Sequence, residues 1–89
     1  MGLHKLQKKL QKIFSHPIPA NLDLKGVENL LEHLGFEIEH TKKNHIKIKD
    51  KGGKEITLIA HDNQISNKDE IVKLKHFLEE HGINGETIL

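Results

Sequence analysis

Residues 36–60 read FEIEHTKKNHIKIKDKGGKEITLIA, and this stretch predicts the fold. Apolar and polar residues alternate in three short runs, at 36–40, 45–49 and 55–60, a pattern typical of strands with one buried face. The segment DKGG at 50–53 predicts a hairpin turn, because glycine tolerates the positive φ that such a turn needs. Consecutive strands joined by short turns usually pair, so the stretch predicts a three-stranded antiparallel sheet.

Three amphipathic segments outside this stretch predict helices. Apolar residues recur at helical spacing within residues 3–14, with lysines between them. Asp23 is a good N-cap for a helix over 24–34, and Asn67 starts the last helix, with Glu70 three residues on in a capping arrangement. The predicted order is α-α-β-β-β-α, an α+β fold with the helices on one face of the sheet.

The length of 89 residues predicts one domain with a thin core. We expect this domain to span residues 1–89, with an N-terminal amphipathic helix in 1–14, an αβββα core over 23–82 and a tail at 83–89 that has no clear pattern. The alternation also predicts which side chains of the sheet enter the core. They are Phe36, Ile38, Ile46, Ile48, Ile56 and Leu58.

The composition argues against several classes of protein. Charged residues make up 30% of the chain. No apolar run approaches the roughly 20 residues that a membrane-spanning helix needs, so we expect no membrane association. The chain has no cysteine, which excludes disulfides and thiolate metal ligands and fits a cytoplasmic location. No two of the eight histidines have the His-x-x-x-His spacing of a helical metal site, so we expect no metal and no other cofactor.

The net charge of +1 conceals alternating blocks of charge. Residues 1–15 carry four lysines and no acid, and residues 40–54 carry six lysines against one acid. Residues 16–39 and 55–89 are acidic overall. Such a chain can present a positive surface to a polyanion while remaining nearly neutral. Because the chain has no arginine, this attraction is expected to act on the nucleic-acid backbone and not on base edges.

The second strand run carries the candidate catalytic residue. A period of two places His45, Lys47 and Lys49 together on the face of the sheet opposite the core. An imidazole exchanges protons near neutral pH, and lysines can hold phosphate and stabilise developing charge. RNA brings its own nucleophile, the 2′-hydroxyl, so this chemistry needs no metal. The competing interpretation is that His45 is a solvated residue without a role.

Other histidines have simpler interpretations. His61 follows the third strand and is a second candidate for proton transfer, or else a residue that anchors the next loop by a hydrogen bond. His40 lies on the core side of the first strand near its end, where we expect it to be half-buried. His81 falls near the end of the last helix, where the helix dipole favours it.

Four stretches of the chain resemble the HicA family of toxins from type II toxin–antitoxin systems. The similarity runs from about Phe14 to Ile83. Lys43-Asn44-His45 stands where the family usually has Gly-Ser-His, and His61 matches a histidine that is frequent after the third strand. The other three stretches are IFSHPIPAN at 13–21, VENLLEHLGF at 27–36 and FLEEHGI at 77–83.

The resemblance implies a metal-independent endoribonuclease that cleaves mRNA, on a fold like the double-stranded-RNA-binding domain. It implies that His45 is catalytic and that a HicB-like antitoxin protein covers the active face. On this interpretation RNA phosphates meet Lys42, Lys43, Lys47 and Lys49. The chain departs from the family where Lys43-Asn44 replaces Gly-Ser and where Ile59-Ala60 stands in place of a frequent proline.

Two alternatives stay open at this point. One is a non-catalytic RNA-binding module on the same fold, although the first turn of the last helix, NKDE at 67–70, is nearly neutral. The other is a protein-interaction domain without a nucleic-acid role. The lysine-rich N-terminal helix has alternatives of its own, namely binding to nucleic acid or a membrane surface, or packing on its own domain, which the amphipathic pattern favours.

Overall fold

The central sheet has three antiparallel strands in the order β2-β3-β4, in a computed structural model that describes residues 2–89. The strands are β2 (Glu37–Lys42), β3 (His45–Lys49) and β4 (Glu55–Ile59). The bounds of β3 agree with the prediction, whereas β2 begins one residue later and ends two residues later than predicted. The α+β class and the three-stranded antiparallel sheet are confirmed.

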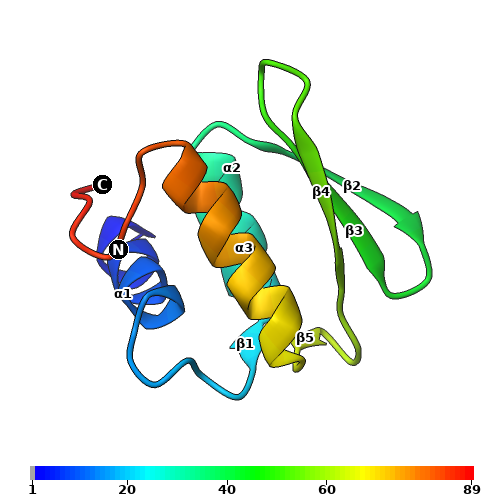
Figure 1. The fold of residues 1–89 in the computed structure, drawn as a ribbon, viewed down its shortest axis with the longest axis horizontal. Coiled ribbons are helices and arrows are strands. Elements are labelled where there is room, and N and C mark those ends of the chain that lie inside the picture. Colours follow the sequence, from blue (N-terminus) through cyan, green and yellow to red (C-terminus); the bar gives the residue numbers. More distant parts are fainter. Residues whose placement is uncertain (1) are drawn as a thin grey trace.

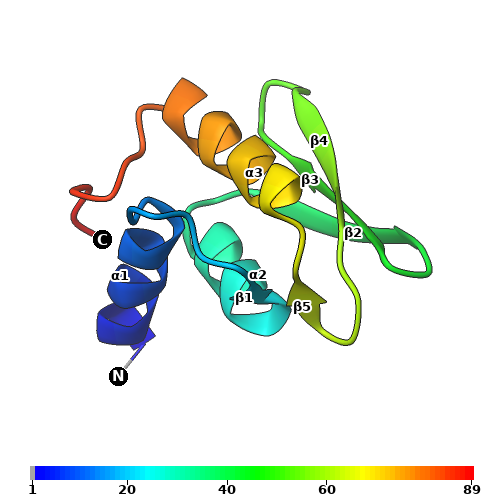
Figure 2. The same cartoon turned by 60° about the horizontal axis from the view of Figure 1, so that its bottom comes forward.

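Three helices form two layers beside this sheet: α1 (Gly2–Ile13), α2 (Leu24–His33) and α3 (Lys68–Glu80). Figures 1 and 2 show that α2 and α3 cover one face of the sheet, as predicted, while α1 packs against α2 on the side away from it. None of the helices among residues 2–89 has the length and apolar character to cross a membrane.

The capping residues predicted from sequence are confirmed at both core helices. An oxygen of Asp23 accepts a hydrogen bond from Gly26 N at 2.8 Å, and Asn67 Oδ1 accepts one from Asp69 N at 2.8 Å. The predicted capping arrangement of Glu70 is wrong. Its Oε1 accepts instead from the backbone N–H of Ile59 at 3.0 Å, and so ties α3 to β4.

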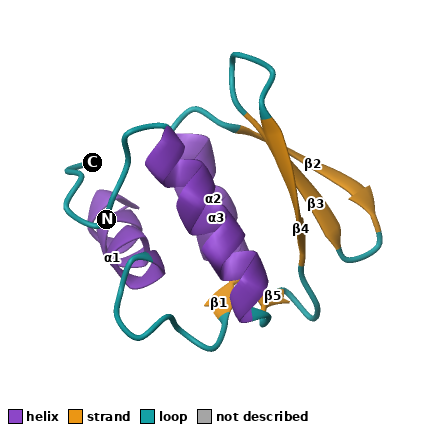
Figure 3. Ribbon diagram, in the orientation of Figure 1, coloured by secondary structure: helices purple, strands orange, loops and turns teal. Residues whose placement is uncertain are grey.

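A second sheet of two short strands was not predicted. β1 (Leu22–Asp23) pairs antiparallel with β5 (Gln64–Ile65), and Leu22 and Ile65 are both fully buried. The observed order is therefore α-β-α-β-β-β-β-α, and the predicted polar loop after β4 contains a strand (Figure 3). Two-residue strands are too short to show a period, so alternation could not predict them.

The core agrees closely with the predicted set. Phe36, Ile46, Ile48 and Leu58 are buried, and Ile38 and Ile56 pack half-buried against them. The N-terminal helix joins the same core through Leu10 and Ile13, both fully buried. Its apolar face is therefore packed on its own domain.

The tail at 83–89, for which the sequence predicts no pattern, lies against α1. The side-chain amide of Gln7 donates from Nε2 to Thr87 O at 2.7 Å, and its Oε1 accepts from Leu89 N at 3.0 Å. One glutamine thus satisfies two backbone groups of a segment that has no helix or strand of its own.

Candidate functional site

His45 is the first residue of β3, next to the tight β2–β3 turn. Its neighbours in the strand register are Lys42 of β2 and Ile59 of β4. Asn44, in the turn, has a φ of +69°, a left-handed conformation that asparagine adopts more readily than most residues. The pairing shifts by one residue between His40 and Lys42, and this irregularity brings Lys42 opposite His45.

The imidazole of His45 is held by the turn. Its Nδ1 lies 3.1 Å from the backbone carbonyl oxygen of Lys43. A carbonyl only accepts hydrogen bonds, so Nδ1 carries the proton in this contact. In the neutral ring Nε2 then has a free lone pair, and among residues 2–89 no protein group bonds to that atom. The residue as a whole is half-buried.

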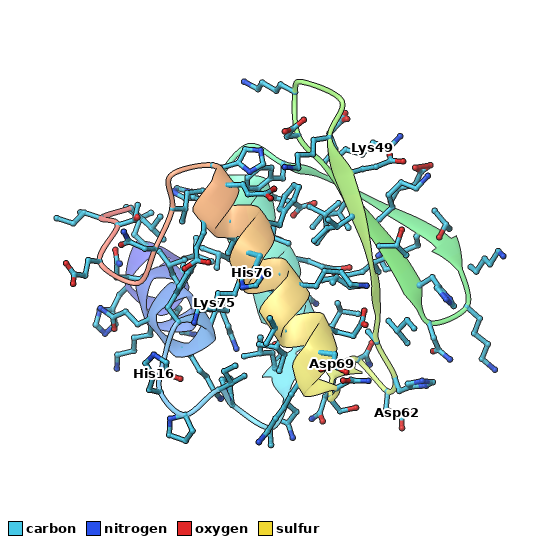
Figure 4. All side chains as sticks on the ribbon, in the orientation of Figure 1. His16, Lys49, Asp62, Asp69, Lys75 and His76 are labelled. Atoms are coloured by element: carbon cyan, nitrogen blue, oxygen red, sulfur yellow. The ribbon has the colours of Figure 1, made fainter. Side chains whose placement is uncertain are left out.

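His45 is one of the residues that line a hollow of about 220 Å³. Figure 4 labels Asp62 beyond the end of β4, at the end of the sheet where β3 begins, and Lys49 toward the other end. The hollow has apolar and polar lining residues. They are Leu24, Ile46 and Ala60, together with His40, Asn44, His45, Asp62 and Asn63.

His40 is a second histidine of this hollow, and its predicted half-burial is wrong. Its side chain is 65% exposed, and its Nε2 lies 2.8 Å from Glu28 Oε2 on α2. Since a carboxylate oxygen accepts, the ring donates from Nε2 and Glu28 fixes its orientation. This pair joins a helix to a strand and leaves no local pattern in the sequence, so it could not be predicted.

Two of the predicted RNA-binding lysines are already paired with acids. Lys47 Nζ lies 4.0 Å from Glu55 Oε1, and Lys49 Nζ lies 3.5 Å from Glu39 Oε1. Glu37 also faces Lys49 in the register, so the open face around these lysines carries three acids against two bases. Alternation already implied this balance, since glutamates alternate with the core residues of β2.

The other two predicted lysines, Lys42 and Lys43, are exposed and close to His45 in the register and the turn. His61 is exposed as well. Its backbone forms two hydrogen bonds of 2.8 Å with Gln64 across a tight turn, and its side chain does not line the hollow. The structure thus brings His45 together with Lys42, Lys43 and His40, and places His61 outside this group.

The most strongly held histidine is His81, at the far end of α3. Its Nδ1 donates to Phe77 O at 2.8 Å and its Nε2 donates to Asp50 Oδ2 at 2.7 Å. The hydrogen bond to the Phe77 carbonyl is the largest cause that raises the pKa of His81, and the hydrogen bond to the Asp50 carboxylate raises it further. The same bond to His81 lowers the pKa of Asp50. With both nitrogens donating, the ring is an imidazolium without a lone pair for catalysis, and its role is structural.

Within residues 2–89 no three histidine or acidic side chains gather in an arrangement that could hold a metal ion. No family model, curated protein or solved structure matches the chain.

Proposed function

We propose that the protein is a metal-independent endoribonuclease in which His45 is the general base. The observation that carries this proposal is the hydrogen bond from His45 Nδ1 to Lys43 O, which leaves Nε2 as the basic atom of a residue that lines a hollow. A general base must combine a free lone pair with access to its proton donor. Nε2 of His45 has the lone pair, and the residue belongs to the lining of the hollow.

The reaction follows from the chemistry of RNA. Nε2 accepts the proton of a ribose 2′-hydroxyl, and the 2′-oxygen attacks the adjacent phosphorus. The bond from phosphorus to the 5′-oxygen breaks, which leaves a 2′,3′-cyclic phosphate, and the departing 5′-oxygen takes up a proton to become a 5′-hydroxyl. Lys42 and Lys43 are the ammonium groups next to His45 that can stabilise charge on the phosphoryl oxygens.

His40 is the candidate for the group that protonates the leaving oxygen. It lines the same hollow as His45, and the carboxylate of Glu28 orients its ring through the hydrogen bond from Nε2. His61, the second histidine predicted from sequence, remains an alternative for this role from a position outside the hollow.

The resemblance to HicA toxins extends the proposal. Apart from the two-residue strand β5 before α3, the elements from α2 to α3 follow an αβββα order similar to that of the double-stranded-RNA-binding domain, and His45 is the first residue of β3. We propose on this basis a cytoplasmic HicA-like toxin that cuts mRNA and is restrained by a HicB-like antitoxin. The charge balance around Lys47 and Lys49 supports the alternative, a non-catalytic module whose sheet binds a protein partner.

The test is cleavage of a mixed-sequence RNA in the presence of EDTA. We expect the wild-type chain to cut and His45→Ala to be inactive, with 2′,3′-cyclic phosphate at the new ends. His33→Ala is a matched control, because His33 is an exposed histidine of α2 that does not line the hollow. His40→Ala should slow cleavage without removing it. Equal cutting by wild type and His45→Ala would contradict the proposal, and no cutting by either would favour the partner-binding module.

A further inference from the structure

The four lysines of α1 lie on one face of that helix. Lys5, Lys8, Lys9 and Lys12 follow the spacing i, i+3, i+4, i+7, which aligns side chains along a helix. We call these four residues the lysine stripe. The apolar face of the helix is buried through Leu10 and Ile13, so the stripe and the packed face are distinct.

The stripe borders a hollow between α1 and α2 of about 390 Å³. Leu6, Asp23, Gly26 and Asn29 complete its lining. The stem of Lys9 crosses close to Gly26, where a β-carbon would lie only 2.7 Å from Lys9 Cε. The absence of a side chain at Gly26 therefore lets this ammonium group reach the hollow.

The lysine stripe differs in its charge environment from four other lysines of the protein. Lys47, Lys49, Lys54 and Lys73 each have a glutamate partner. Among residues 2–89 no acidic side chain forms an ion pair with the stripe. Asp23 is the one acid that lines the hollow, and it accepts a hydrogen bond from Gly26 N. The stripe is thus a concentration of positive charge that the protein does not neutralise.

We propose that the lysine stripe binds the phosphate backbone of a single-stranded nucleic acid. Insertion into a membrane needs an exposed apolar face, and that of α1 is buried except for Leu3. A protein partner usually needs aromatic or apolar anchors, which the stripe lacks. Phosphate contacts need only positive charge and no base-reading arginine. This proposal concerns binding and stands whether or not His45 cleaves RNA.

The experiment measures binding of a fluorescein-labelled 2′-O-methyl oligouridine by anisotropy as salt is varied. This probe has no free 2′-hydroxyl, so failure of cleavage cannot be confused with failure of binding. Four phosphate contacts predict a slope of log affinity against log salt of about −3, or roughly a 50-fold loss between 50 and 200 mM salt. Lys→Gln at positions 5, 8, 9 and 12 together should remove most of the binding at 50 mM and flatten the slope.

Two further variants make the result specific. Lys→Gln at 47, 49, 51 and 54 removes the same charge from the sheet and its turn, and should keep the wild-type slope. Lys→Arg at 5, 8, 9 and 12 preserves charge and should bind as well as wild type. Circular dichroism checks folding, and glutamine and lysine have similar helix propensities. Loss of binding in the sheet variant alone would overturn the proposal. So would the absence of binding by wild type at 50 mM, or binding to phosphatidylserine vesicles without binding to the oligonucleotide.

Discussion

The imidazole Nε2 of His81 lies 2.7 Å from Oδ2 of Asp50, and this contact joins the end of α3 to the turn between β3 and β4. The rings of Phe36 and Phe77 lie against the same imidazole, with centroids 5.0 and 4.7 Å from it. The ion pair between Lys54 and Glu80 ties the same two segments together. Helix and hairpin are therefore fixed to each other at this corner largely by charged groups.

The first prediction concerns stability at alkaline pH. The Phe77 carbonyl and Asp50 raise the pKa of His81 above its ordinary 6.5, so its contribution to stability is complete below pH 6.5. This contribution is lost as the pH rises through the raised value in the folded protein. We expect the Tm to fall over this range in wild type and to fall less in His81→Gln. Thermal unfolding by circular dichroism at a series of pH values measures it, and equal slopes for the two proteins would count against the contact.

The contact between His81 and Asp50 also predicts how stability changes at acidic pH. Its bond to His81 lowers the pKa of Asp50 below 3.8, so the stabilisation is complete above pH 3.8 and is lost as the pH falls through the lowered value. Asp50→Asn should therefore unfold at a lower temperature than wild type at neutral pH. The difference should shrink below pH 3.8. A constant difference at all pH values would contradict this assignment.

A further prediction concerns Glu70, whose side chain accepts from the backbone N–H of Ile59. Glu70→Ala leaves that N–H without its partner and should cost about 1–3 kcal/mol of unfolding free energy. Glu70→Gln keeps an accepting oxygen and should cost less. Urea denaturation compares the two variants, and equal losses would show that the hydrogen bond contributes nothing specific.

Asn44 tests the geometry of the turn before His45. Its positive φ disfavours a β-branched side chain, so Asn44→Val should lose about 1–2 kcal/mol of stability. Asn44→Gly should remain stable, because glycine adopts this conformation freely. If the turn positions the ring of His45 for the proposed reaction, RNA cleavage should also decline in Asn44→Val and persist in Asn44→Gly. The reverse order of stability would contradict the left-handed turn.

Ile48 tests the core at the central strand. It is fully buried, so Ile48→Ala should lose about 2–5 kcal/mol through lost burial and the remaining cavity. Ile88 is 89% exposed and provides a matched control, since Ile88→Ala should change stability by less than about 0.5 kcal/mol. Similar losses in the two variants would be inconsistent with this core.

The local patterns of the sequence were enough to predict the larger elements. Alternation located β3 with its bounds, and Asp23 and Asn67 were correctly predicted as N-caps, because these features depend on residues close together in the chain. The pairing of Leu22 with Ile65 was missed, since two-residue strands have no measurable period. The hydrogen bond of Glu70 was not predicted, because its partner is the backbone N–H of Ile59 on another element. That N–H takes the place of the capping contact expected within α3.

The candidate site was predicted only in part. Alternation predicted that His45 lies on the face of the sheet opposite the core. The contact between Glu28 and His40 could not be predicted in this way, because it depends on how α2 lies over the sheet. The neutralisation of Lys47 by Glu55 depends on strand register, which the turn at 50–53 sets. The register of the two hairpins therefore determined which of the predicted lysines are paired with acids.

The layering of the fold sets a length scale for any RNA that engages both proposed surfaces. In Figure 1 the helix α1 and the β2–β3 hairpin lie toward opposite ends of the longest axis, which extends 32 Å. At about 3.4 Å per nucleotide along a stacked strand, that span corresponds to roughly nine nucleotides. A trinucleotide bound at His45 cannot reach α1 at the same time. The length of the RNA alone would then decide whether a substrate bound at His45 also contacts the lysines of α1.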